Sequence, residues 1–223
     1  MWQLYQFPLC PFSRKLRLLM SEKGIPYELC REHPWEGREE FFGMNQAGRT
    51  PVLHDPERSI TLADSRAICE YLEETVDRVP MINGTAANRA EIRRLTAYFD
   101  EIFFEEVTGP LLMERMKKRL VTRESPDSGA IRQAMKFAHE HLYYIDWLVD
   151  TRAWLGGSMM GLADLAAAAQ VSVADYLGGI DWSNHEQAAS WYAILKSRPS
   201  FGPLLSERME VIRPPAHYAE VDF

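Results

Sequence analysis

The stretch from Leu4 to Gly24 constrains the fold of this chain more than any other. A short apolar run at its start is followed by Pro8, by a turn that carries Cys10 and Pro11, and then by apolar residues at helical spacing. This order predicts a strand, a turn and the beginning of a helix. Pro11 suits the first helical turn, where a missing N–H group costs nothing, and Ser13 is predicted to cap the helix.

Cys10 is the sharpest candidate for chemistry, because the pattern places it beside the N-terminus of that helix. The helix dipole and the basic residues Arg14 and Lys15 would favour a thiolate there. The alternative is a structural thiol inside the turn. Ser13 is a second candidate catalytic residue, and its alternative role is the helix cap already described.

The next fifty residues alternate between strand and helix patterns. Tyr27 to Cys30 is typical of a second strand, Pro51 opens a third, and Ser59 to Leu62 is its predicted hairpin partner. A further helix is predicted to begin at Asp64 or Ser65. Two strands joined through a helix predict a right-handed parallel unit.

The remainder of the chain has the period of helices throughout. Pro80 and Gly84 lie in the segment that separates the two patterns. The Ala-rich segment that ends at Tyr176 is apolar nearly all round and is predicted to be the central buried helix. We therefore predict an N-terminal α/β domain at residues 1–77, a linker at 78–87, an all-helical domain at 88–208 and an extended tail at 209–223.

Composition narrows the classes of function. A net charge of −7, from 25 basic and 32 acidic side chains, argues against nucleic acid as the main partner. The 3 cysteines are not closely paired in sequence, which indicates a reducing compartment. The sequence has no signal pattern, no long apolar span and no zinc-ligand spacing, so we expect a cytoplasmic protein without membrane insertion or a bound metal.

The predicted elements follow the order strand, helix, strand, helix, strand, strand, helix (βαβαββα). Three motifs lie along this order: Cys10-Pro11-Phe12-Ser13, Thr50-Pro51-Val52-Leu53 and Asp64-Ser65-Arg66-Ala67-Ile68. This arrangement resembles the thioredoxin-like N-terminal domain of cytosolic glutathione transferases, and the resemblance extends from residue 4 to about residue 208. It implies a thioredoxin-like domain followed by an all-α domain, and a homodimer.

The resemblance also implies a glutathione site. Asp64 and Ser65 would hold the γ-glutamyl end at a helix N-terminus, and the backbone of Thr50 and Pro51 would pair with the cysteinyl part. Met44 stands where catalytic relatives often carry Lys to meet a ligand carboxylate. Arg49, Arg14 or Trp35 could take over that contact.

Two functions follow from the resemblance. The first is an enzyme, a glutathione-dependent transferase or thiol–disulfide reductase with Cys10 as nucleophile. The second is an interaction protein, because the whole chain also resembles glutathione-transferase-like bacterial cell-division proteins of the FzlA type, which bind the filament protein FtsZ. Stretches such as PFSRKLRLLMSEKG and KSRPSFGPLLSERM carry that resemblance. The second function would place the contact with the filament at Trp35, Lys117, Lys118, Arg119 and the tail residues Tyr218 to Phe223.

Overall fold

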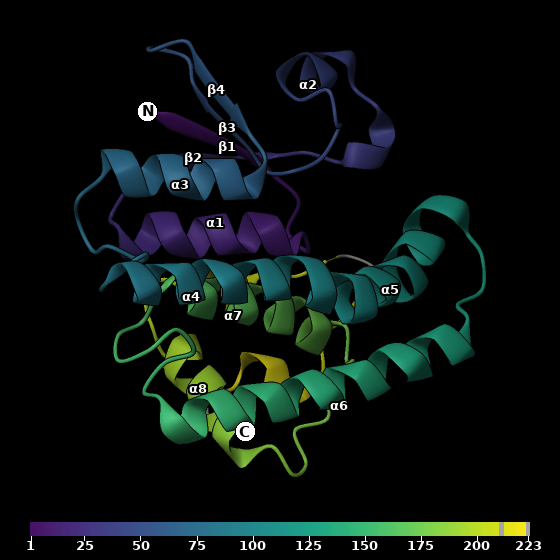
Figure 1. The fold of residues 1–223 in the computed structure, drawn as a ribbon. Helices are drawn as coiled ribbons and strands as arrows, with labels where there is room; N and C mark the ends of the chain where they lie inside the picture. Colours follow the sequence, from purple (N-terminus) through teal and green to yellow (C-terminus); the bar gives the residue numbers. More distant parts are fainter. Residues whose placement is uncertain (210–211, 222–223) are drawn as a thin grey trace. The chain divides into compact units, whose positions relative to one another are not determined.

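A computed structural model of the chain describes residues 1–209 and 212–221. The chain divides into two compact units, Met1–Met81 and Ile82–Phe223. We call them the N-terminal unit and the helical unit (Figure 1). None of the helices within the described residues is both long enough and apolar enough to span a membrane.

The N-terminal unit is built on a mixed sheet with the strand order β2-β1-β3-β4. Its elements are β1 (Trp2–Gln6), α1 (Pro11–Glu22), β2 (Tyr27–Arg31), the short 3-10 helix η1 (Pro34–Glu36), α2 (Glu39–Met44), β3 (Val52–Asp55), β4 (Ile60–Ala63) and α3 (Ser65–Thr75). The strands β1 and β2 are parallel, whereas β3 is antiparallel to both β1 and β4. The predicted order βαβαββα is therefore confirmed.

The core of this unit lies between the sheet and two helices. The helices α1 and α3 lie side by side on one side of the sheet (Figure 1). Leu4 on β1, Leu19 on α1 and Ile68 on α3 are each completely buried. The apolar positions at helical spacing thus form the faces that pack on the strands.

A buried ion pair fixes the end of the N-terminal unit. The ammonium group of Lys23 lies 2.8 Å from the carboxylate of Glu73 and donates to the carbonyl oxygens of Val76 and Arg78 at 2.9 and 3.1 Å. The amide of Met81 donates to Glu73 at 2.9 Å. Residues 76–81 are therefore held on α1 and α3 before the helical unit begins.

The helical unit consists of helices of three kinds. They are α4 (Ala86–Tyr98), the π-helical η2 (Phe99–Thr108), α5 (Gly109–Leu111), the π-helical η3 (Leu112–Thr122), α6 (Ser128–Thr151), α7 (Leu162–Tyr176), α8 (Glu186–Lys196), α9 (Gly202–Ser206) and the 3-10 helix η4 (Ala216–Ala219). Gly109 and Pro110 lie in α5, between η2 and η3. Pro110 has no N–H group to donate to the preceding helical turn, and both flanking segments nevertheless stay helical.

The helix α7 is the centre of this unit, as predicted. Each of its residues is buried, and it packs against α4 and η2. Its alanines allow close approach of those neighbours. Asp164, in its first turn, accepts a hydrogen bond from the amide of Gly161 at 2.9 Å, so the backbone around Gly161 and Asp164 closes the start of the helix.

Candidate functional site

Cys10 lies at the N-cap of α1, and its side chain is half-buried. Its Sγ donates to the carbonyl oxygen of Thr50 at 3.4 Å. The prediction that Ser13 caps this helix is wrong. Because Pro11 occupies the first helical position, the residue before it becomes the cap, and Ser13 lies inside the helix with a buried hydroxyl group that has no hydrogen-bond partner among the described residues.

The basic residues that follow Cys10 are buried rather than exposed to solvent. Arg14 and Lys15 are both 0% exposed. The Nε of Arg14 donates to the carbonyl oxygen of Pro8 at 2.8 Å, so part of its hydrogen-bonding capacity fixes the turn that carries Cys10. Arg14 thus has a structural role in the loop between β1 and α1.

The segment before β3 is tied by its own side chains. The Nδ2 of Asn45 donates to the carbonyl oxygen of Arg49 at 2.7 Å, and the peptide bond between Thr50 and Pro51 is cis. The side chain of Arg49 is exposed, and Met44, at the end of α2, is half-buried. Arg49 is therefore accessible to a ligand, while its own carbonyl group is already bonded.

Asp64 is the cap of α3, which decides between the two residues that the sequence left open. Its carboxylate accepts hydrogen bonds from the amides of Arg66 and Ala67 at 2.8 and 3.2 Å. Its φ of 73° lies in the left-handed region, an uncommon conformation for a residue other than glycine that is frequently found at functional sites. Ser65 follows as the first residue of the helix and is buried.

The strand register brings these segments together. Val52 pairs with Ala63 and also with Tyr5, so the residues just before Val52 and just after Ala63 lie at one end of the sheet. Cys10 reaches the same end through its contact with Thr50. The sheet end therefore gathers a thiol, a backbone turn and a helix N-terminus.

Trp35 lies in η1, close to this unit's sheet. Its ring stacks on that of His33, with the centroids 5.1 Å apart, and meets the ring of Phe7 edge-on at 5.0 Å. The side chain remains half-buried. Trp35 therefore covers Phe7 with one part of its ring and leaves another part at the surface.

Three basic residues on η3 form what we call the η3 patch: Lys117, Lys118 and Arg119. They differ in their surroundings. Lys117 and Arg119 are exposed, whereas the ammonium group of Lys118 lies 2.7 Å from Glu114. Glu114 also accepts from the amide of Asp127 at 2.6 Å. The pKa of Glu114 is lowered, mainly by the hydrogen bond from Lys118. Lys118 thus helps to fix the turn that joins η3 to α6. Lys117 and Arg119 are the exposed residues of the η3 patch.

The tail docks on the helical unit itself. Tyr218 is 0% exposed, its hydroxyl group donates to the carbonyl oxygen of Leu204 at 3.2 Å, and its ring meets that of Tyr176 edge-on. His217 binds Asp175 on α7 at 2.9 Å. The side chain of Tyr218 is thus an internal anchor and is inaccessible to a partner while the tail is docked. Phe223 lies outside the described residues.

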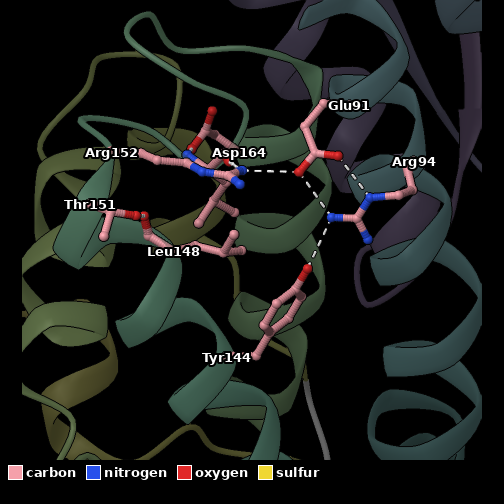
Figure 2. Close-up of polar contacts among 8 residues, drawn as sticks. Glu91, Arg94, Tyr144, Leu148, Thr151, Arg152 and Asp164 are labelled. Carbon is pink, nitrogen blue, oxygen red and sulfur yellow. Dashed lines mark hydrogen bonds and ion pairs between the residues drawn. The ribbon is translucent and has the colours of Figure 1, made fainter. Parts of the chain in front are cut away.

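A polar network beside α6 was not predicted from the sequence (Figure 2). Glu91 on α4 binds Arg94 through two hydrogen bonds of 2.8 and 2.9 Å and binds Arg152 at 3.0 Å. Arg94 also donates to the hydroxyl group of Tyr144 at 3.0 Å. Only the spacing of Glu91 and Arg94, three residues apart on one helix, could have indicated a part of it.

Comparison with known proteins agrees with this architecture. The family model for the glutathione S-transferase N-terminal domain matches residues 9–75. The chain is 44% identical over 222 residues to FtsZ-localized protein A of Caulobacter vibrioides, covering 99% of this chain and 97% of that protein. The solved structure of FzlA from C. crescentus superposes with a TM-score of 0.96 at 43% identity over 100% of this chain and 99% of that one. A glutathione S-transferase structure from Rhodospirillum rubrum F11 gives a TM-score of 0.97 at 47% identity, covering 100% of both chains.

Proposed function

Because the chain belongs to the glutathione S-transferase superfamily, in the group that includes FtsZ-localized protein A, we propose that it binds FtsZ filaments and acts in cell division. The observation that carries the proposal is the extent of the similarity. Identity of 44% covers 99% of this chain, so both units and the tail are included. A match confined to the N-terminal unit would support only the fold.

The proposed contacts with the FtsZ filament are the exposed residues of the η3 patch, Lys117 and Arg119, and the exposed part of Trp35. Lys117 and Arg119 are exposed in a protein whose net charge is −7, so they form a local positive surface that favours an acidic partner. Lys118 supports this surface through Glu114 rather than by direct contact. Tyr218 acts indirectly, because its burial fixes the path of the tail.

Sedimentation with FtsZ polymer tests the proposal. We expect the protein to pellet with FtsZ in the presence of GTP and to stay in the supernatant with GDP. The double variant Lys117→Glu, Arg119→Glu should pellet several-fold less, and the wild-type interaction should weaken as salt is added. Arg31→Glu with Arg58→Glu is the matched control, since both residues are exposed in the N-terminal unit. Absence of pelleting by the wild type would contradict the proposal.

Glutathione-dependent thiol exchange is the second candidate function, and the contact between Cys10 and Thr50 favours it. The Cys10 thiolate would attack the glutathione sulfur of a mixed disulfide, which forms a disulfide between Cys10 and glutathione and releases the other thiol after protonation. A second glutathione thiolate would then attack that bond, which yields oxidised glutathione and restores Cys10. Thr50, Pro51, Asp64 and Ser65 would position the peptide, and the exposed Arg49 would meet a carboxylate.

We place the protein in the cytoplasm as a homodimer. The three cysteines are all free thiols in the structure, which suits a reducing compartment. A two-fold homodimer is the commonest assembly of soluble proteins and is the one expected for this superfamily. Retention on immobilised glutathione, tested beside retention on immobilised FtsZ, would show which ligand the dimer takes.

A further inference from the structure

The surface of η3 carries a narrow row of side chains that reach solvent. Met113 and Val121 are 43% and 41% exposed, and Lys117 between them is also exposed. We call these three residues the η3 stripe. Within the part of the chain that the structure describes, none of the three side chains makes a hydrogen bond or an ion pair. The stripe is therefore an apolar surface with an available cation at its middle.

The winding of η3 places the stripe along one line. Because η3 is π-helical, its hydrogen bonds join residues five apart, so side chains four or five positions apart are neighbours on its surface. Met113, Lys117 and Val121 follow one another at intervals of four and extend over roughly 10 Å. The adjoining side of η3 is buried in the helical unit through Leu112 and Met116. The stripe thus lies on a helix that is fixed to the core.

The end of η3 is also held by polar contacts. The ammonium group of Lys118 lies 2.7 Å from Glu114, which accepts from the amide of Asp127 at 2.6 Å. The amide of Glu124 donates to the carbonyl oxygen of Lys118 at 3.0 Å. Lys118 is therefore already paired, and Lys117 remains the cation of the stripe. A surface that is fixed before binding loses little conformational entropy when a partner arrives.

The spacing of the stripe fits an extended segment of a partner. Side chains four apart on a helix have their Cβ atoms about 5–6 Å apart. Alternate residues of an extended chain lie on one face about 6.6 Å apart. Three alternate side chains of such a segment can therefore each meet one member of the stripe. A partner helix would need a wider apolar face than three residues provide.

The chemistry of the stripe defines the residues of that segment. Met113 and Val121 favour apolar side chains, and the flexible thioether of Met113 adapts to side chains of different shape. Lys117 favours a carboxylate, and it belongs to a local positive surface of a chain whose net charge is −7. An acidic side chain between two apolar ones complements all three positions.

From these features we infer that the η3 stripe binds an extended partner segment in which an acidic residue lies two positions from an apolar residue on either side. The inference rests on the function proposed above, since this segment would be the part of FtsZ that η3 contacts. It adds apolar contacts, which persist at high salt, to the electrostatic contacts that salt screens. One such segment buries much less area than a stable interface needs, so a short peptide binds weakly and reversibly.

Methyl NMR of protein labelled with ¹³C at the methionine methyl groups tests the inference without FtsZ. The probe is the peptide acetyl-Ser-Leu-Ser-Glu-Ser-Leu-Ser-amide, which should shift the Met113 resonance in a saturable way. Met159 is the matched control, because it is 54% exposed outside η3 and should not shift. Peptides with Lys in place of Glu, or with Ser in place of both Leu, should bind at least fivefold more weakly. Lys117→Glu should reverse the preference between the Glu and Lys peptides.

Two results of this titration would overturn the stripe. One is a Met113 shift no larger than that of Met159 at millimolar peptide. The other is equal binding of the Glu and Lys peptides to the wild-type protein.

FtsZ sedimentation then relates the stripe to the filament. Met113→Ser with Val121→Ser should pellet several-fold less than wild type with an unchanged dependence on salt, whereas Lys117→Glu should lower both the amount and the dependence. Ile194→Ser is the control, at an apolar side chain that is 53% exposed on α8, and should pellet as wild type does. Wild-type pelleting by the Met113 and Val121 variant would overturn the stripe as a filament contact. A wild-type protein that binds the peptide but never pellets would contradict only the FtsZ function, so the two failures are distinguishable.

Discussion

Arg152 and Asp164 bind the two hydrogen-bonding groups of one residue, Leu155. The Nη1 of Arg152 donates to the carbonyl oxygen of Leu155 at 2.8 Å, and the amide of Leu155 donates to Asp164 at 2.9 Å. Arg152 also binds Glu91 (Figure 2), while Asp164 accepts from the indole of Trp191 at 3.0 Å. The turn between α6 and α7 is thus held by two carboxylates, of which Asp164 is fully buried and Glu91 is paired with arginines.

Asp164 should make the protein less stable as the pH rises. Burial raises its pKa to about 6 from an ordinary value of 3.8, although the hydrogen bonds from Leu155, Gly161 and Trp191 act in the opposite direction. The folded protein therefore binds this proton more tightly than the unfolded chain does. The contribution of Asp164 to the free energy of unfolding should fall by about 2 kcal/mol between pH 4 and pH 6, out of about 3 kcal/mol over the whole titration.

Urea unfolding of wild type and Asp164→Asn at a series of pH values measures this effect. The variant should be less stable than wild type at neutral pH because its amide group presents a donor where donors already converge. The difference in stability between the two proteins should itself change between pH 4 and pH 6. Asp150→Asn, at an exposed carboxylate, should keep the wild-type slope. An Asp164→Asn variant with the full wild-type slope would contradict the assignment.

Glu91 should show the opposite dependence on pH. The hydrogen bond from Arg94, followed by that from Arg152, lowers its pKa to about 2, and partial burial opposes them. Its stabilising contribution is present above pH 4.5 and is lost as the pH falls toward 2. Glu91→Gln should cost about 1–2 kcal/mol at pH 7 and almost nothing near pH 2, measured by the same unfolding series. Glu105→Gln, an exposed carboxylate on η2, should cost little at either pH.

Elements with a strong local pattern could be predicted from the sequence. The strand at Tyr27 to Cys30, the start of α3 at Asp64 or Ser65 and the buried helix α7 depend on periodicity and on residue types that act within a few positions. The cap of α1 was misassigned because two local signals competed. Ser13 is a good cap in isolation, but Pro11 fixes the start of the helix before it.

The contacts that join distant segments could not be predicted in this way. Glu91 and Arg152 are separated by 61 positions, and His217 meets Asp175 across 42. No period within one helix encodes such pairs, since they depend on how the helices pack. The contacts of the tail with α7 and α9 likewise could be found only in the structure.

Tyr218 should anchor the tail. Tyr218→Ala removes a fully buried ring and its hydrogen bond to Leu204, a change that typically costs about 3–5 kcal/mol for large aromatic residues. Part of this loss should appear as local release of the tail, so trypsin should cleave after the exposed Arg208, at the start of the tail, several-fold faster than in wild type. Tyr218→Phe keeps the ring and should cost only about 1 kcal/mol, with nearly wild-type proteolysis. Equal cleavage rates in Tyr218→Ala and wild type would show that the tail is anchored elsewhere.

Cys10→Ser should separate the two candidate functions. Serine is a better N-cap than cysteine, and its hydroxyl group can donate to the Thr50 carbonyl in place of the thiol, so the variant should be at least as stable as wild type. It should pellet with FtsZ polymer as wild type does, because the proposed contacts on η3 and η1 do not include residue 10. It should also lose any exchange with a glutathione mixed disulfide, since a hydroxyl group cannot replace the attacking thiolate.

Cys30→Ser on β2 is the control for Cys10→Ser and should retain both activities. Full exchange activity in Cys10→Ser would remove this thiol from the chemistry, and loss of pelleting in a folded variant would link the sheet end to the filament.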